Sequence, residues 1–211
     1  MKTVYFIRHG QTDANIAGAQ QGAAEPLNTT GLRQAEIVAE RVKHLPVERI
    51  IASSMTRAQQ TATAVAAASG LSFETSDLFR EFAIPTDLAG ALPDPDPAAP
   101  LNQYLVEREQ FAADPEWRCG DGENFCELAE RVAMALAYLA DQTEEYIAVV
   151  SHGRFLRVLG GCVVQGGTCA GADVVTFART LKLTNAGISV FQYNDDRWQL
   201  LTWNDMNHFA E

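Results

Sequence analysis

The sequence predicts an α/β fold, a three-layer α/β/α sandwich around a mainly parallel central sheet. Two observations predict it. Short apolar runs typical of buried strands alternate with longer segments of helical periodicity, and polar motifs follow several of the strand-like runs directly. The chain has 211 residues, of which 47% are hydrophobic and 20% charged. This length and composition predict one globular domain, residues 1–211, with a well-buried core.

The first half of the chain contains three strand-like segments and two helices. β-branched and aromatic residues predict a buried strand over residues 3–7. Apolar residues at helical spacing begin at Thr30 and stop at Pro46, and a second, alanine-rich helix ends at Gly70. The predicted order is a strand at 3–7, a helix from Thr30, a strand at 49–52, a helix at 55–69 and an extended segment at 71–79.

The second half opens with the least regular stretch, residues 84–100, which holds five of the eight prolines. Proline is excluded from central strands and helix interiors, so a loop or lid is predicted here, within an insertion around residues 82–122. A plain surface loop fits the same composition. The elements predicted next are helices at 101–112 and 123–140, a strand at 146–150, a helix at 155–164, and paired strands at 188–193 and 199–203 around Asn194-Asp195-Asp196.

Charge and cysteine content restrict the function classes. The formal net charge of -11 opposes binding to nucleic acids and anionic membranes. The apolar run at the N-terminus is too short for a signal-peptide core, and no apolar stretch has the length of a membrane span. A cytoplasmic protein is therefore expected. Its four cysteines lack the spacing of a metal or redox motif, so reduced thiols and no disulfide are predicted. A homodimer is compatible with the sequence, which does not define the oligomeric state.

Two histidine motifs follow predicted strands. Arg8-His9-Gly10 follows the first, and Ser151-His152-Gly153 follows the strand at 146–150. Ligands gather at the carboxyl ends of strands in open α/β sheets, so the two motifs are expected at one edge. Taken alone, an Arg–His pair at a strand end is more often part of a solvated sheet edge.

Further segments make the pattern more specific. The chain reads RHGQTDAN from Arg8, SSMTRAQQTA from Ser53, an acid at Glu81, GEN from Gly122 and SHG from Ser151; LNTTGLRQAE from Leu27 and TNAGIS from Thr184 add to these. Together these segments resemble the histidine phosphatase superfamily, also called phosphoglycerate mutase-like, in its phosphatase branch. The resemblance spans almost the whole chain.

The resemblance implies a role for each catalytic candidate. His9 accepts the phosphoryl group, because an imidazole with a pKa near 6.5 keeps one ring nitrogen unprotonated at neutral pH. Arg8 and Arg57 hold the phosphate charge with planar guanidinium forks, and His152 donates to the equatorial oxygens. Glu81 is expected to be protonated by its surroundings and to pass its proton to the leaving oxygen. The nearby acids Glu74, Asp77 and Asp87 are alternatives to Glu81.

The remaining site candidates are expected to bind the phosphate or the rest of the substrate. Asn15, Thr12, Gly10 and Gly153 are the candidates for phosphate binding, although the hydroxyl of Thr12 equally fits a turn. Arg154 stands where the family's usual SHGG has glycine. It is expected either to read a second anionic group or to be a solvated helix-start arginine. No metal and no cofactor are predicted, since the histidine motifs lack an adjacent acidic ligand pair.

The segment after Glu81 departs from the family's patterns. It reads FAIPTD, so both the FGxWEG-like segment of many phosphatases and the RHYG-like segment of mutases are missing. The leading hypothesis is a metal-independent phosphatase that acts through a phosphohistidine on His9, on a small phosphorylated substrate or a phosphorylated side chain. The alternatives are phosphoglycerate mutase-type phosphoryl transfer and a non-catalytic protein that binds a phosphorylated ligand. His44 and His208, which no motif surrounds, are expected to be ordinary surface or cap histidines.

Overall fold

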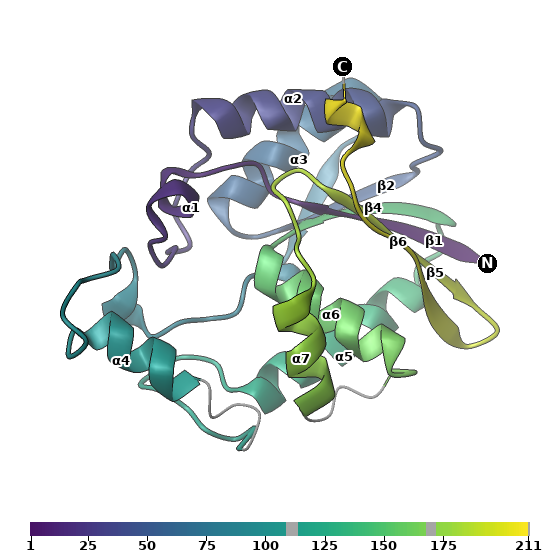
Figure 1. Ribbon diagram of the computed structural model, residues 1–211. Helices are drawn as coiled ribbons and strands as arrows, with labels where there is room; N and C mark the ends of the chain where they lie inside the picture. Colours follow the sequence, from purple (N-terminus) through teal and green to yellow (C-terminus); the bar gives the residue numbers. More distant parts are fainter. Residues whose placement is uncertain (109–113, 168–171, 211) are drawn as a thin grey trace.

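A six-stranded sheet runs through the centre of the computed structural model, which describes residues 1–108, 114–167 and 172–210 (Figure 1). The strands lie in the order β3-β2-β4-β1-β5-β6. Their bounds are β1 Lys2–Arg8, β2 Arg49–Ser53, β3 Phe73–Ser76, β4 Tyr146–Ser151, β5 Ile188–Asn194 and β6 Arg197–Asp205. The first four strands of this order are parallel, and β5 and β6 add antiparallel pairs at the β1 side. The predicted fold class is confirmed.

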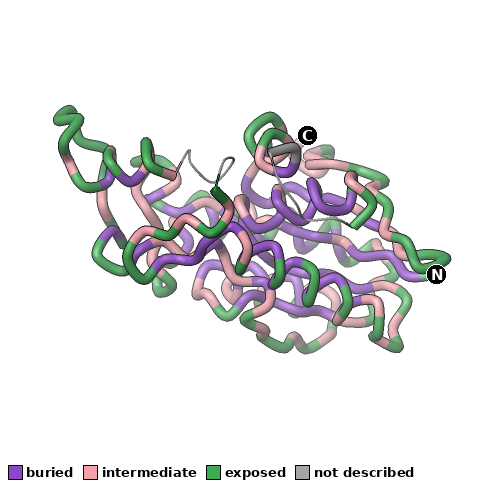
Figure 2. The backbone as a smooth tube through the Cα atoms, turned by 90° about the horizontal axis from the view of Figure 1, so that it is seen from below, coloured by how far each residue is buried: buried purple, intermediate pink, exposed green. Residues whose placement is uncertain are grey.

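Helices cover both faces of the sheet. In Figure 1, α2 and α3 lie on one side and α5, α6 and α7 on the other. The bounds are α1 Asp13–Ala17, α2 Thr29–Lys43, α3 Thr56–Ser69, α4 Pro100–Glu107, α5 Phe125–Ala140, α6 Gly153–Val164 and α7 Ala172–Thr180, with short 3₁₀ turns at Asp77–Phe79, Thr86–Leu88 and Asn207–Phe209. Each helical layer encloses its own apolar cluster against the sheet. Figure 2 shows the buried stretches of the chain in the interior of the molecule.

Local signals explain where the long helices begin and end. The side chain of Asn28 accepts from the Gly31 amide at the start of α2, and Asn124 forms a capping box with Glu127 at the start of α5. Gly70 ends α3 in the left-handed region, at a φ of 69°, where a side chain would be disfavoured. Asn28 and Asn124 thus fix the first turns of α2 and α5 at the carboxyl edge of the sheet, and Gly70 ends α3 before β3.

The β1–β4 pairing positions the two histidine motifs. Arg8 at the end of β1 lies opposite Ser151 at the end of β4. His9 and His152 therefore leave neighbouring central strands at the same height. The two histidines lie far apart in the sequence, but the parallel register of β1 and β4 brings them together.

The region after Glu81 forms an extension beside the sandwich. Leu88, Leu101 and Tyr104 make a small separate cluster that holds α4 to the 3₁₀ turn at Thr86–Leu88. The predicted helix at 101–112 is confirmed as α4 as far as Glu107, and residues 109–112 lie outside the described residues. Whether this extension acts as a lid stays a prediction.

Some elements differ from the sequence prediction. The extended segment at 71–79 is a four-residue strand followed by a 3₁₀ turn, and the short helices α1 and α7 were not predicted. The expectation of no disulfide is wrong at Cys162, which is disulfide-bonded, because spacing in the sequence does not report proximity in the fold. Cys119 and Cys126 are free, and Cys169 lies outside the described residues. No helix in the described ranges has the length and apolar character needed to cross a membrane.

Candidate active site

A cavity of about 140 Å³ opens at the carboxyl edge of the sheet, where four chain segments meet. Arg8 ends β1 and His9 follows it. Arg57, in the first turn of α3, and His152, which precedes α6, lie beside His9 but do not line the cavity. Glu81 comes after the 3₁₀ turn at Asp77–Phe79. The residues that line the cavity are Arg8, His9, Asn15, Ala19, Gln20, Gln21, Glu81, Phe82, Ile84 and Arg154.

His9 is buried and held in one orientation. Its Nδ1 atom lies 2.7 Å from the carbonyl oxygen of Gly10. A carbonyl only accepts, so Nδ1 carries the proton and donates, which leaves the lone pair on Nε2. Burial, the nearby His152 ring and the charges of Arg57 and Arg8 lower the pKa of His9 well below its usual range. His9 is therefore uncharged at neutral pH, and Nε2 is the ring nitrogen that can act as a nucleophile.

Arg57 and His152 are the neighbours of the His9 ring. Arg57 has no exposed surface, and its Nε donates to Nε2 of His9 at 3.3 Å. The rings of His9 and His152 are 5.1 Å apart between centroids, near enough for both to contact one phosphate group. Nε2 of His152 pairs with the hydroxyl of Ser53 at 2.7 Å, and that hydroxyl also accepts from the Met55 amide. When the Ser53 hydroxyl donates to Nε2 of His152, the ring proton of His152 lies on Nδ1. This Nδ1 atom has no partner among the described residues.

Arg8 contributes a guanidinium with an unused donor. Its Nη1 donates to the carbonyl oxygen of Leu183 at 2.5 Å, while its buried Nε has no partner within the described part of the chain. Burial lowers the pKa of Arg8 to about 10. The negative charge of Glu81 opposes this shift, and the positive charges of Arg157 and Arg57 add to it. The group stays charged at neutral pH. A buried unpaired donor is costly, and an anionic ligand would satisfy it.

Glu81 is held at the start of α6, with a protonation state opposite to the predicted one. Its carboxylate accepts from three backbone amides, those of Phe82, Arg154 and Phe155, at 2.9–3.0 Å. Burial raises the pKa of Glu81, but the charge of Arg154 and these amide hydrogen bonds outweigh burial, and the net shift is downward. The ligand-free site therefore holds an ionised Glu81. The expectation of a carboxyl group protonated by its surroundings is wrong for this state, because those surroundings are rich in donors.

A buried ion pair that the sequence did not reveal fixes the segment carrying Glu81. Arg131 of α5 donates through Nε and Nη2 to both carboxylate oxygens of Glu123, at 2.8 and 2.7 Å. Nη1 of Arg131 also donates to the carbonyls of Leu78 and Arg80, and Glu123 accepts from the Ala83 amide. The pair thus binds the backbone on both sides of Glu81. The GEN motif marked Glu123, but nothing in the sequence indicated its partner.

Asn185 is a second residue that sequence reasoning missed, although the TNAGIS segment contains it. Its Nδ2 donates to the carbonyls of His9 and Gly10 and to Oδ1 of Asn15. Oδ1 of Asn15 also accepts from the Thr12 amide. These contacts orient Asn15 so that its own Nδ2 is available toward the cavity that it lines.

Thr12, Gly10 and Gly153 have structural roles, and their predicted phosphate contacts stay a prediction. Thr12 is fully buried and caps α1 by accepting from the Asn15 amide. The amide of Gly10 already donates to Thr61, and a Cβ atom on Gly10 would lie 2.4 Å from the carbonyl oxygen of Gly31. A Cβ on Gly153 would lie 3.1 Å from Nε of Arg8. The glycines are therefore needed for close packing.

The alternative acids and the other histidines lie away from the cavity lining. Glu74 pairs with Arg49 at 2.7 Å, Asp77 accepts from the Ser54 hydroxyl, and Asp87 is exposed. His44 is exposed and lies 3.3 Å from Glu40, and Nε2 of His208 contacts the Ala186 carbonyl. Arg154 is not a solvated helix-start arginine alone: it lines the cavity and stacks on the Phe82 ring at 5.1 Å.

The buried histidines predict that the protein loses stability in mild acid. The pKa of both His9 and His152 is lowered in the folded state, chiefly by burial. In the unfolded chain they bind protons below about pH 6.5, so acid stabilises the unfolded state. The free energy of unfolding should fall by about 1.4 kcal/mol per pH unit for each histidine as the pH drops from 6.5 toward 5. Urea unfolding at pH 7, 6 and 5 measures this slope. His152→Gln should make it shallower, and an unchanged slope would contradict the assignment.

A parallel-sheet fold that presents two buried histidines and two arginines at strand ends is typical of proteins that bind phosphate groups. The chain belongs to the histidine phosphatase superfamily, branch 1, whose family model matches residues 4–206. The superfamily predicted from the motifs is confirmed.

Individual relatives cover nearly the whole chain. A probable phosphoglycerate mutase GpmB of Proteus mirabilis is 33% identical, over 100% of this chain and 96% of the relative. A probable phosphoglycerate mutase GpmB of Yersinia pestis is 32% identical, over 96% and 90%. Among solved structures, a mycobacterial glucosyl-3-phosphoglycerate phosphatase bound to VO₃ matches with a TM-score of 0.79 at 25% identity, over 97% of this chain and 99% of that one.

Proposed function

We propose that this protein is a metal-independent phosphomonoester phosphatase that forms a phosphohistidine on His9. The observation that carries the proposal is the fixed tautomer of His9. Its Nδ1 proton is held by the Gly10 carbonyl, its Nε2 lone pair accepts from Nε of Arg57, and the centroid of the His152 ring is 5.1 Å from its own. This geometry supports attack by Nε2 on phosphorus, with positive charge already in place for the phosphoryl oxygens.

The first step transfers the phosphoryl group to His9. The bond from phosphorus to the substrate oxygen breaks as the bond to Nε2 forms, and the leaving oxygen takes a proton from Glu81. A bound phosphate dianion adds negative charge beside Glu81, and a like charge raises the pKa of a carboxyl group. Substrate binding thereby counteracts the effect of Arg154 and the three amides on Glu81.

The second step returns His9 to its starting state. Glu81, left ionised by the first step, accepts a proton from water as the water oxygen attacks phosphorus. The bond from phosphorus to Nε2 breaks and inorganic phosphate leaves. Arg8, Arg57 and His152 hold the phosphoryl oxygens throughout, since their charges and donors are preorganised by burial.

Phosphoglycerate mutase activity is the second candidate, because the relatives at 32–33% identity carry that name. A mutase uses the same phosphohistidine but returns the phosphoryl group to the substrate. The missing RHYG-like segment after Glu81 disfavours it. The phosphatase at 25% identity supports hydrolysis.

Rapid acid-free quenching during turnover of p-nitrophenyl phosphate tests the proposal. We expect an acid-labile, base-stable phosphoryl adduct on His9 and release of inorganic phosphate, both lost in His9→Ala. With 3-phosphoglycerate as substrate, formation of 2-phosphoglycerate would identify a mutase instead. Binding of phosphate without turnover or adduct would leave only a non-catalytic phosphate-binding protein.

A further inference from the structure

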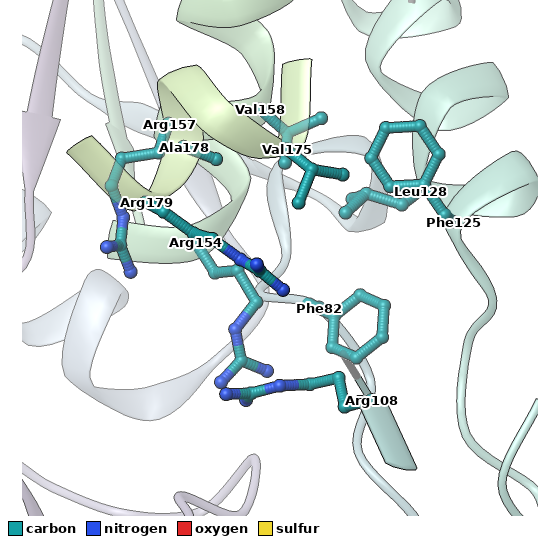
Figure 3. Close-up of a pocket in the computed structure, with 10 residues that line it drawn as sticks. All are labelled: Phe82, Arg108, Phe125, Leu128, Arg154, Arg157, Val158, Val175, Ala178 and Arg179. Atoms are coloured by element: carbon teal, nitrogen blue, oxygen red, sulfur yellow. The ribbon is translucent and has the colours of Figure 1, made fainter. Parts of the chain in front are cut away.

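A second cavity, of about 270 Å³, lies beside the active-site cavity (Figure 3). Phe82 and Arg154 line both cavities, so the two spaces are neighbours across these side chains. The lining residues are Phe82, Arg108, Phe125, Leu128, Arg154, Arg157, Val158, Val175, Ala178 and Arg179. Small-molecule sites have volumes of roughly 300–1,000 Å³, a size that the two cavities reach together. The phosphate accounts for only part of such a ligand.

One part of the second cavity is strongly cationic. Four of its ten lining residues are arginines, in a chain whose net charge is -11. Across the described ranges, the guanidinium groups of Arg154 and Arg157 form no ion pair within 4.0 Å of a carboxylate oxygen. Burial lowers the pKa of Arg157, and the charge of Arg154 lowers it further, against an opposing effect of Glu81. Crowded guanidinium groups repel one another, and a bound anion would relieve that repulsion.

The opposite part of the cavity is apolar. Figure 3 shows the rings of Phe82 and Phe125 and the side chains of Leu128, Val158 and Val175 around the same space. Arg154 joins the two parts, because its guanidinium stacks on the Phe82 ring at 5.1 Å. A simple inorganic anion would leave the apolar part unfilled. A ligand with an apolar body and an anionic end would contact both parts.

We infer that the substrate's leaving group carries an apolar body and a second anionic group, a carboxylate or a phosphate. The scissile phosphate occupies the His9 cavity, the apolar body lies against Phe82 and Phe125, and the second anion binds Arg154 and Arg157. This inference rests on the proposed phosphatase function. It assigns Arg157 a role in substrate recognition, and it distinguishes this site from one adapted to small neutral phosphate esters.

A matched pair of substrates tests the inference. One is 3-(4-phosphonooxyphenyl)propanoate, and the other is its neutral amide, which has the same shape and the same reacting phosphate. The wild type should give a kcat/KM for the acid at least about 10-fold above that for the amide, the ratio that about 1.4 kcal/mol of anion recognition produces. The same scaffold with a phosphate in place of the carboxylate shows which anion the arginines prefer.

Substitutions show which arginine recognises the second anionic group of the substrate. Arg157→Gln should bring the acid-to-amide ratio close to one, mainly through KM for the acid. Arg154→Gln should do the same and also change the rate with the amide, because Arg154 contacts the region of Glu81. Arg197→Gln removes an exposed charge at the start of β6 and should leave the ratio unchanged.

Failure of the inference is distinguishable from failure of the proposed function. Equal rates for acid and amide, unchanged by Arg157→Gln, with normal adduct formation on His9 would overturn the inference and retain the phosphatase. If no substrate turns over, calorimetry with His9→Ala still decides. The acid should then bind at least about 10-fold more tightly than the amide, and equal binding would refute the pocket assignment.

Discussion

Replacement of Arg131 by methionine is expected to lower the free energy of unfolding by about 3–5 kcal/mol. The substitution keeps the long apolar stem but leaves the carboxylate of Glu123 buried without its bidentate partner. Within the described part of the chain, Arg80 is the cation that remains near this carboxylate, with Nη2 at 3.8 Å, and the Ala83 amide still donates to it. Three backbone carbonyls around Glu81 lose a donor in the same substitution. Urea unfolding at pH 7, followed by tryptophan fluorescence, measures the change.

A double variant separates the two causes of this loss. Arg131→Met with Glu123→Met removes the unpaired charge, so most of the destabilisation due to charge should be recovered. The Leu78–Ala83 backbone would still lack its partners, and kcat should stay below the wild-type value. A stability loss of less than about 1 kcal/mol in Arg131→Met would show that the pair is not essential to the fold.

Replacement of Glu81 by glutamine is expected to lower kcat for an alkyl phosphate by about 100-fold or more, because proton transfer contributes 10²- to 10⁴-fold in such sites. With p-nitrophenyl phosphate the leaving group needs no proton, so the first step should remain comparatively fast. The second step still needs a base to activate water. Glu81→Gln should therefore show a burst of nitrophenol and accumulate the phosphohistidine on His9.

Stopped-flow absorbance and the quenched adduct assay measure the two steps separately. Asp87→Asn is the matched control, since Asp87 is exposed on the 3₁₀ turn at Thr86–Leu88 and lies outside the cavity lining. It should leave both steps unchanged. An equal loss of kcat for both substrates, without a burst, would mean that Glu81 does not act as the base in the second step.

The fold and the meeting of the two histidine motifs could be predicted because they depend on local signals. Apolar periodicity marks the strands and long helices, and the parallel arrangement implies that strand ends share one edge. Arg8 and Ser151 are indeed paired in register. The short helix α1 escaped prediction, although Thr12 and Asn15 form its capping box, since five residues give too little periodicity to recognise.

The chemistry around Glu81 could not be predicted, because distant parts of the chain provide it. The amides that lower the pKa of Glu81 include those of Arg154 and Phe155. The backbone before Glu81 is held by Arg131, and the backbone after it is held by Glu123. Asn185 likewise acts through contacts with His9 and Asn15 that no spacing rule describes. The hydroxyl of Thr12 fitted a cap and a ligand equally from sequence, and burial decides for the cap.

The position of β1 in the sheet has a consequence for biosynthesis. This first strand pairs only with β4 and β5, both of which belong to the last third of the chain. At 5–20 residues per second, a ribosome needs about 7 to 30 seconds to go from the end of β1 to the end of β4, the first of these partners. During that interval Val4, Phe6 and Ile7 have no strand to pair with, so the nascent chain should depend on chaperones that shield its N-terminal segment.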